Sequence, residues 1–421
     1  LLDGGDTWQG SYTSLKTQGA DMVEVMKALG TEAMVGHWEF TFGQDRLKEL
    51  IDKLGYPFLG GNVFDTEWDE PVFESTAFFE KGGVSIAVIG QHFPYTPIAN
   101  PSYMVEGWSF GIRPEVLQKN VNKAKKQGAE IVVLLSHNGF DVDQKLAAMI
   151  NGIDVILTGH THDAIPKGIR IKDTLLLSSG SHGKYLGRVD LKVKNGKVVD
   201  TSSNLIPVFS DIIPPDPDMT KMINEIRVPY QDECDRAIGE TETLLYRRGN
   251  FNGSWDDVIC NTIMQERDTE ISLSPGFRWG TTLLPGQKIT IDDIYSQTSM
   301  NYPEVYRIEM TGKMIKELLE DVCDNIFNPD PFFQQGGDMV RVGGLTYTCH
   351  PKNKIGNRIS DLRMISSGKT IESNKKYVVG GWGSINPNVK GPAIYNLLEN
   401  YISEKKIIKK SNLEAVKIVG M

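Results

Sequence analysis

The stretch "EIVVLLSHNG", residues 130–139, decides the fold class. Its aliphatic run has the length of a strand, and a histidine and a glycine follow where the run ends. A second run of the same design, "IDVILTGHTHD" at residues 153–163, comes after the helical stretch "DQKLAAMI". Near-continuous apolar strands that alternate with helices are typical of a sheet covered on both faces. We therefore predict an α/β fold with histidines at the carboxyl ends of its strands.

The alternation of strands and helices extends from the first residue to about residue 205. Amphipathic helical stretches include "QDRLKELIDKL" (44–54) and "PEVLQKNVNKAKKQG" (114–128), and "VSIAVIGQ" (84–91) is a further apolar strand. Residues 172–202 predict successive strands, with "KNGK" (194–197) as a hairpin turn.

The pattern changes after the proline-rich stretch "FSDIIPPDPDM" at residues 209–219. A charged helical stretch follows, and beyond it helices mix with strands in the manner of an α+β domain. At 421 residues the chain is long enough for two large domains. We predict a first domain at residues 1–208, a linker and bridging helix at 209–240, and a second domain at 241–421.

The composition limits the partners. Charged residues make up 24% of the chain and the formal net charge is −9, which disfavours a general nucleic-acid binder and an anionic membrane surface. No apolar run approaches the ~20 residues that a membrane-spanning helix needs. The chain begins "LLDGGDTWQG" without an initiator methionine or a targeting segment, so we expect its native N-terminus to lie upstream.

The cysteines carry no metal-binding pattern. All four, Cys234, Cys260, Cys323 and Cys349, are far apart in the sequence, and no C-x-x-C pair is present. This spacing disfavours a zinc knuckle or a thioredoxin-like redox site. They are interpreted as buried apolar residues, with at most one disulfide.

Ligand-type side chains recur at the ends of the predicted strands. These are Asp6, His37, His137, His160 and His162. One histidine after a strand is usually unremarkable, but the chain has only seven, and four of them occupy glycine-flanked strand ends. Side chains at the carboxyl ends of the strands collect at one edge of a sheet, so we expect all five to converge there. Imidazole with carboxylate suits Mn, Fe or Zn, and a two-metal site with an activated water suits an anionic ester substrate.

The motifs "GGDTWQGS" (4–11), "GHWEFTFG" (36–43), "SHNG" and "GHTHD" together resemble the calcineurin-like metallophosphoesterase superfamily. The second domain resembles the C-terminal domain of 5′-nucleotidases. The resemblance implies a two-domain 5′-nucleotidase-like architecture: an N-terminal α/β/β/α metallophosphoesterase sandwich and a C-terminal α+β domain. It also implies that Asp6 bridges two metals, that His137 and His160 bind one of them, and that His162 binds the other. The family's first motif, D-x-H, would lie upstream of residue 1.

One motif departs from the nucleotidase pattern. Where nucleotidases have "GNHEFDYG"-type sequences, an ungapped alignment puts His37 at the metal-binding Asn, Trp38 at the catalytic His and Thr41 at its Asp partner. A metal ligand is retained, but the His–Asp dyad is absent. A phosphomonoesterase without the dyad lacks its general acid for an alkoxide leaving group, whereas a sulfur leaving group needs little protonation.

The same motif, with "FPYTPIANP" (93–101), "SPGFRWGTTLLPGQ" (274–287) and "QQGGDMVRVGGL" (334–345), resembles the SoxB family of sulfur-oxidation thiosulfohydrolases. This resemblance implies a periplasmic, monomeric, metal-dependent hydrolase. It would remove a sulfonate group from a cysteine S-thiosulfonate on the SoxYZ carrier protein and release sulfate during thiosulfate oxidation. The implied cofactor is a pair of Mn ions, while the ligand types alone leave Zn and Fe open.

Four residues are predicted to act on the substrate. Arg278 matches the arginine of the family's N-G-G-G-I-R motif and would bind the sulfonate through two parallel hydrogen bonds. Arg341 and Asp338 are further candidates, and Trp38 would make the leaving-group side apolar. The uncertain candidates, each as well explained by a structural role, are Trp8, Gln9, His92, His182, His350 and Trp382.

Two other functions remain open on the sequence alone. One is a 5′-nucleotidase or another metal-dependent phosphoesterase with an altered dyad. The other is a binding scaffold without catalysis, which is disfavoured because a decayed site has no chemical reason to keep five ligand-type residues at strand ends.

Overall fold

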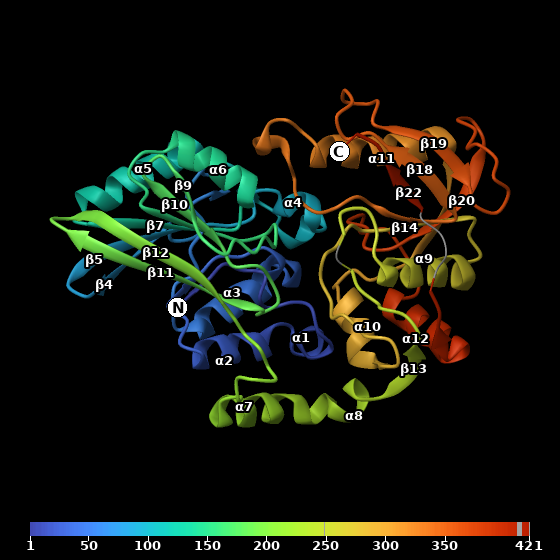
Figure 1. The fold of residues 1–421 in the computed structure, drawn as a ribbon, viewed down its shortest axis with the longest axis horizontal. Coiled ribbons are helices and arrows are strands. Elements are labelled where there is room, and N and C mark those ends of the chain that lie inside the picture. The colour runs from blue at the N-terminus through green and yellow to red at the C-terminus, as the bar shows by residue number, and fades with distance from the viewer. Residues whose placement is uncertain (248, 411–414, 421) are drawn as a thin grey trace. The chain divides into compact units, whose positions relative to one another are not determined.

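The computed structural model describes residues 1–247, 249–410 and 415–420. The chain separates into two compact units. The first comprises Leu1–Gln9 and Thr17–Arg227, and the second comprises Gly10–Lys16 and Val228–Met421. Figure 1 follows the chain through both by colour.

A six-stranded mixed sheet forms the centre of the first unit. Its strand order is β4 (Thr76–Lys81), β5 (Val84–Gln91), β7 (Ile131–Ser136), β8 (Val155–Thr158), β10 (Thr174–Ser178), β9 (Ile169–Ile171). The four inner strands run parallel, and β4 and β9 pair antiparallel at the edges. Every residue of β7 is buried, as its aliphatic sequence predicts. The predicted α/β class is confirmed.

Both faces of this sheet are covered. Helices α5 (Pro114–Lys126) and α6 (Phe140–Met149) lie together on one face (Figure 1). On the other, β7 side chains such as Val133 pack in a core with side chains of the long hairpin β11 (Tyr185–Lys194) and β12 (Lys197–Pro207). The hairpin turns at Asn195 and Gly196, both with positive φ, so the predicted "KNGK" turn is confirmed.

The N-terminal strands β1 (Leu2–Asp3) and β2 (Ala33–Met34) pair with each other, outside the six-stranded sheet. The prediction that all ligand-bearing strands share one sheet is therefore wrong. Both strands are only two residues long. On its other side β2 bonds to residues 57–59, which form no regular strand: Met34 N–H donates to the Pro57 carbonyl oxygen, and Leu59 N–H donates to the Met34 carbonyl oxygen.

Helices of the same region form a second core in the first unit. In α3 (Gln44–Leu54) the leucines Leu47, Leu50 and Leu54 recur on one face and pack with Trp8 and Phe40. The other short elements of this unit are α2 (Ala20–Ala28), η1 (Trp38–Phe42), β3 (Val63–Asp65), α4 (Thr96–Ala99), η2 (Ser102–Met104), β6 (Trp108–Phe110) and α7 (Pro217–Arg227). Helix α7 packs against α2.

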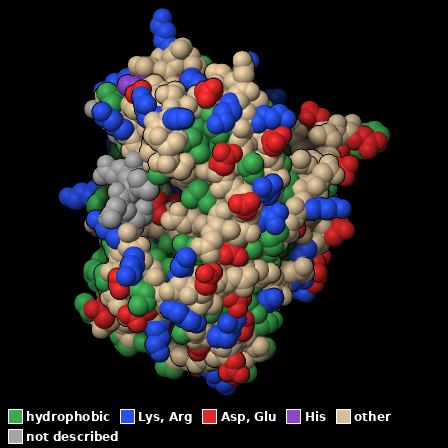
Figure 2. All heavy atoms as spheres, turned by 90° about the vertical axis from the view of Figure 1, so that its right-hand side faces the viewer, with side chains coloured by type: hydrophobic (Ala, Val, Ile, Leu, Met, Phe, Trp, Pro, Cys, Tyr) green, Lys and Arg blue, Asp and Glu red, His purple; other side chains and the backbone are tan. Residues whose placement is uncertain are grey.

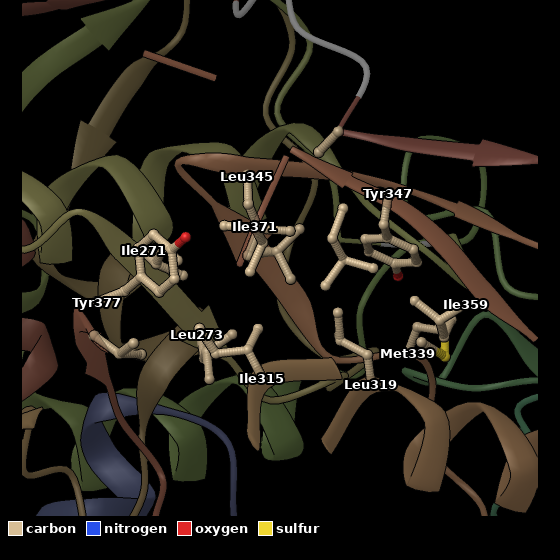
Figure 3. Close-up of a cluster of buried hydrophobic side chains, with 14 of the residues drawn as sticks. Ile271, Leu273, Ile315, Leu319, Met339, Leu345, Tyr347, Ile359, Ile371 and Tyr377 are labelled. Atoms are coloured by element: carbon tan, nitrogen blue, oxygen red, sulfur yellow. The ribbon is translucent and has the colours of Figure 1, made fainter. Parts of the chain in front are cut away.

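The second unit is built on a four-stranded sheet. Its order is β16 (Tyr306–Thr311), β20 (Lys376–Gly381), β14 (Ile271–Ser274), β17 (Arg341–Gly343). Helix α9 (Ser254–Arg267) packs against β14 and β17. Figure 3 shows the main core, in which Leu273 of β14, Leu319 of α11 (Gly312–Ile326) and Tyr347 of β18 (Leu345–Cys349) lie in one cluster.

Two smaller sheets complete this unit. Their orders are β19 (Ile359–Met364), β18, β22 (Val416–Ile418), and β15 (Lys288–Thr290), β13 (Ala237–Thr241), β21 (Ile407–Ile408). The remaining elements are α1 (Tyr12–Thr17), η3 (Val228–Tyr230), α8 (Gln231–Cys234), α10 (Ile291–Thr298), η4 (Pro331–Phe333) and α12 (Ile394–Lys405). A capping box of Thr290 and Asp293 starts α10.

The surface carries charges of both signs. On the face in Figure 2, lysine and arginine side chains are interspersed with aspartate and glutamate. Across the described part of the chain, no helix combines the length and the apolar character that a membrane crossing requires.

Candidate metal centre

Three of the predicted ligands form one cluster in the first unit. His37 follows β2, His137 follows β7 and His160 follows β8. Ligand nitrogens of all three lie within 4.8 Å of one another. The ring centroids are 5.1 Å apart for His37 with His137 and for His37 with His160. All three histidines are buried.

Asp6 supplies the carboxylate of the cluster. Its Oδ2 lies 3.5 Å from Nδ1 of His37 and 3.7 Å from Nε2 of His137. Burial raises the pKa of Asp6, but the neighbouring imidazoles of His37 and His137 together outweigh burial and hold that pKa well below its usual range. The carboxylate is therefore ionised, as a metal ligand must be.

The orientation of His137 fits a metal ligand. Its Nδ1 hydrogen-bonds to the carbonyl oxygen of Gly4, which directs Nε2 into the cluster. Within the described residues, this buried Nε2 has no hydrogen-bond partner. A histidine whose outer nitrogen donates to a backbone carbonyl and whose inner nitrogen lacks a partner is the usual arrangement around a metal.

The donor set fits Mn, Fe or Zn, because each of these metals accepts imidazole together with carboxylate. The metallophosphoesterase superfamily implies a dinuclear centre. His37, His137 and His160, with the carboxylate of Asp6 beside them, would hold a metal of such a centre.

Glu39 is the residue that sequence reasoning missed. This fully buried carboxylate accepts four backbone N–H groups: Oε2 accepts from Asp6 (3.2 Å) and His37 (2.7 Å), and Oε1 accepts from Thr7 (2.6 Å) and Trp8 (3.3 Å). It thereby fastens the loop after β1 to the loop after β2. Burial, with the nearby charge of Asp6, raises the pKa of Glu39 to about 7. In the sequence, the signal for a buried role of Glu39 was its position between two aromatic residues in "WEF".

The loop that carries His37 is fixed at each of its amides. Gly36 N–H donates to Nδ1 of His92 at 2.7 Å, His37 N–H donates to Glu39, and Trp38 N–H donates to Oδ1 of Asp6 at 3.3 Å. Burial lowers the pKa of His92 to about 3, so this histidine is neutral and can accept. The structure thus places His92 behind the loop as a hydrogen-bond acceptor.

Aromatic rings form the walls of the cluster. The ring of Trp38 stacks on His37 at 4.9 Å between centroids. Phe93 stacks on His160 at 4.2 Å and also lies 4.2 Å from His37. Phe93 begins the motif "FPYTPIANP", whose role the sequence alone did not reveal. The apolar rings of Trp38 and Phe93 therefore line part of the imidazole cluster.

Close backbone packing explains the glycine before His160. A Cβ on Gly159 would lie 3.1 Å from Nδ1 of His137 and 3.2 Å from the Gly4 carbonyl oxygen. His160 and His162 both adopt positive φ angles, a backbone conformation that is uncommon for residues other than glycine. His160 enters the cluster.

His162 lies outside the group of three imidazoles. Its ring is 5.7 Å from the ring of His182, which is exposed and whose Nδ1 lies 2.9 Å from the Ser181 hydroxyl. The structure therefore places the rings of His162 and His182 beside each other. The role of His162 at a second metal stays a prediction.

The candidate residues of the second unit form a buried chain of alternating charges. Oδ1 of Asp338 lies 3.7 Å from the guanidinium of Arg278, and Oδ2 accepts a hydrogen bond from Arg341 at 2.9 Å. Arg341 also lies 3.2 Å from Asp256, which accepts from Arg247 at 2.8 Å. Burial raises the pKa of Asp338, and the two arginines beside it oppose that rise.

The side chains of this charged network differ in how much of their surface is exposed to solvent. The side chain of Arg278 is 16% exposed, that of Asp338 is 3% exposed and that of Arg341 is fully buried. Arg247 and Asp256, which sequence reasoning missed, are also fully buried. Only Arg278 of the predicted trio is therefore open to solvent to an appreciable extent.

Three aromatic rings adjoin this network. Phe277 and Trp279 stack at 3.9 Å between centroids. Trp382 packs edge-on against Phe277, and its indole N–H donates to the Ser274 hydroxyl at 2.8 Å. Because Trp382 is buried and bound in this way, its ring lies in the protein interior. Trp8 is likewise fully buried, and His350 lies 3.1 Å from the Ser360 hydroxyl.

Comparisons with known proteins find related sequences and structures. The family description "5′-nucleotidase, C-terminal domain" matches residues 237–383. A solved structure of the sulfate thiohydrolase SoxB from Thermus thermophilus is 36% identical, with a TM-score of 0.96, and the match covers 100% of this chain and 79% of that one. The metallophosphoesterase YunD of Bacillus subtilis is 33% identical over 87% of this chain and 80% of its own length.

Other curated relatives are longer proteins. The trifunctional nucleotide phosphoesterase YfkN of Bacillus subtilis is 25% identical over 87% of this chain, which spans 28% of that protein. The 5′-nucleotidase of Diplobatis ommata is 24% identical over 63% of this chain and 50% of its own length. The chain therefore spans half or less of these two relatives.

Proposed function

We propose a thiosulfohydrolase activity, from the premise that the chain belongs to the 5′-nucleotidase-like metallophosphoesterases, in the group that contains SoxB. Members of this family are metal-dependent hydrolases. The specific reaction that we propose removes a sulfonate group from a cysteine S-thiosulfonate. The carrier of that cysteine would be a SoxYZ-type protein, and sulfate would be the released product.

The observation that carries this proposal is the stacking of Trp38 on His37. In this position a nucleotidase has the histidine that helps an alkoxide to leave. An indole ring cannot donate a proton to an alkoxide, so ester cleavage would be slow. A persulfide leaves as an anion without prior protonation. Trp38 and Phe93 therefore support a soft, polarisable sulfur leaving group.

The reaction balances as a hydrolysis. The oxygen of a water molecule forms a bond to the sulfonate sulfur, the bond between the two sulfur atoms breaks, and its electron pair leaves with the carrier persulfide. Metals held by Asp6, His37, His137 and His160 would activate the water and polarise the sulfonate when bound. We propose manganese, and the same donor set accepts Zn or Fe.

Arg278 is proposed as the contact to the sulfonate oxygens. It is the most exposed member of the charged chain, and its planar guanidinium can bind two oxygens at once. Asp338 and Arg341 are buried, so we propose that they position Arg278 and do not touch the substrate. Trp38 is proposed to contact the leaving sulfur.

A 5′-nucleotidase activity is the second candidate, because several relatives carry that name. Nucleotidases stack the base on an aromatic side chain near the position of Trp382. Here Trp382 is 2% exposed and donates to Ser274, which leaves little of its face for a base. The burial of Trp382 disfavours this candidate.

The test compares two substrates on full-length, manganese-loaded protein. We expect sulfate release from a peptide that carries a cysteine S-thiosulfonate, and at least 100-fold slower phosphate release from AMP. The double variant Trp38→His, Thr41→Asp restores the nucleotidase dyad and should raise AMP hydrolysis relative to sulfate release. Rapid AMP turnover by the unaltered protein, without sulfate release, would overturn the proposal.

The remaining parts of the proposal concern assembly and place. We propose a periplasmic monomer that meets its carrier transiently and binds neither nucleic acid nor membranes. Light scattering on full-length protein tests the monomer, and a pull-down with a SoxYZ-type carrier tests the contact. A stable dimer would contradict the first point.

A further inference from the structure

Two buried cysteines of the second unit lie close together. Sγ of Cys323, on α11, is 3.4 Å from Sγ of Cys349, at the end of β18, although the residues are 26 positions apart. Both side chains are fully buried and belong to the same core cluster as Leu319 and Tyr347. The remaining cysteines, Cys234 and Cys260, lie outside this cluster.

The backbone around the pair is held firmly. Glu320, one turn before Cys323 on α11, accepts the backbone N–H groups of Arg358 at 2.8 Å and Ile359 at 3.0 Å. The Arg358 guanidinium donates to Asp324 at 2.7 Å, and it also binds the carbonyl oxygen of Phe327 at 3.0 Å. These contacts fix the end of α11 against the strands that follow Cys349. These hydrogen bonds therefore hold in place the backbone segments that carry the two sulfur atoms.

The local charge favours sulfur chemistry at Cys349. The hydrogen bond with Cys323 lowers the pKa of Cys349, and the Arg358 guanidinium lowers it further against the effect of burial. The pKa of Cys323 is raised, first by its hydrogen bond with Cys349 and then by burial. Cys349 is therefore the better nucleophile of the two.

We propose that Cys323 and Cys349 form a disulfide when the protein folds in an oxidising compartment. The oxidant is a disulfide donor of the glutathione class. The Cys349 thiolate attacks the donor and releases one thiol, and Cys323 then attacks the Cys349 sulfur of the mixed disulfide and releases the second. Two electrons and two protons pass to the donor, which becomes two thiols, and the sulfur atoms move from 3.4 Å to a bond of about 2.05 Å.

The disulfide would close a loop that contains two residues of the charged network. Residues 324–348 contain Asp338 and Arg341. A cross-link at the ends of this segment lowers the entropy of the unfolded chain, and the calculated gain increases with loop length. The disulfide would stabilise the second unit without a new contact at Arg278. This inference does not rest on the proposed hydrolase activity.

The test uses the full chain, refolded with oxidised or with reduced glutathione. Thiols are counted in denaturant, and the cross-linked peptides are identified by mass spectrometry. We expect two of the four thiols to disappear after oxidative refolding, in one peptide pair that joins Cys323 to Cys349. Reduction should lower the melting temperature by several degrees.

Single variants separate the pair from the other cysteines. Cys323→Ala and Cys349→Ala should each retain three free thiols and lose the response of melting temperature to reductant. The matched controls Cys234→Ala and Cys260→Ala should retain the cross-link and that response. If these variants fold poorly, the peptide map of the unaltered protein decides the matter. Four free thiols after oxidative refolding, or a cross-link between other cysteines, overturns the proposal.

Discussion

The two candidate regions differ in how their charges are satisfied. In the metal-binding cluster of the first unit, His137 turns a buried nitrogen inward that has no hydrogen-bond partner among the described residues. In the charged chain of the second unit, Asp256 and Asp338 each lie between two arginines. Imidazoles that converge beside one carboxylate form a donor set that suits a metal, whereas a network whose opposite charges pair with one another holds its members in place. We therefore propose that the first region binds a metal and that the second mainly positions Arg278.

The largest expected effect comes from breaking the second network. Arg247→Met leaves Asp256 buried without its 2.8 Å partner, and we expect a loss of about 3–5 kcal/mol in the free energy of unfolding. Urea denaturation measures this loss. The control Arg236→Met removes two largely exposed ion pairs, with Glu233 and Glu399, and should cost less than about 1 kcal/mol for each pair. Equal losses in the two variants would show that the buried network contributes no more to the free energy of unfolding than an exposed ion pair does.

Removal of a metal ligand tests the first region. His137→Ala should lower metal affinity and activity roughly 100-fold or more, because even outer partners of metal ligands contribute 10-fold to 100-fold. Metal content by mass spectrometry and hydrolysis rates are the measurements. His350→Ala, in the second unit, serves as the matched control and should leave both unchanged. Full metal content in His137→Ala would contradict the proposal that His137 binds the metal.

The clustering of the three histidines was predictable because its signals are local. His37, His137 and His160 each follow an apolar run, and strand topology brings such positions together. The two-stranded pairing of β1 and β2 was not predictable, since strands of two residues carry no period. Glu39 was missed because its role depends on four amides from two loops, three of them more than 30 residues away in sequence.

The charged chain was only partly predictable for a related reason. Arg278, Asp338 and Arg341 were found through motif resemblance, whereas Arg247 and Asp256 stand in stretches that carry no functional pattern. Their burial follows from packing among elements that are far apart in the sequence. Sequence reasoning treats an arginine as solvent-exposed by default, and it cannot know that Arg341 is fully buried.

Glu39 offers a test of positioning within the metal-binding region itself. Glu39→Gln keeps the size of the side chain but replaces one acceptor oxygen by an amide that donates, so two of its four backbone contacts are lost. We expect a 10-fold to 100-fold loss of metal affinity with little change in fold. Metal titration and circular dichroism measure these. Unchanged metal affinity would mean that the two loops hold their geometry without Glu39.

The smallest expected effect concerns the residue of the second region that is proposed to touch substrate. Arg278→Lys keeps the positive charge near Asp338 but cannot bind two sulfonate oxygens in parallel. We expect KM to rise roughly 10-fold, or about 1.4 kcal/mol, with kcat nearly unchanged and urea stability preserved. Steady-state sulfate release measures both constants. A large loss of stability instead would place Arg278 with the buried positioning residues, and the contrast between the two regions would then apply to the entire charged chain.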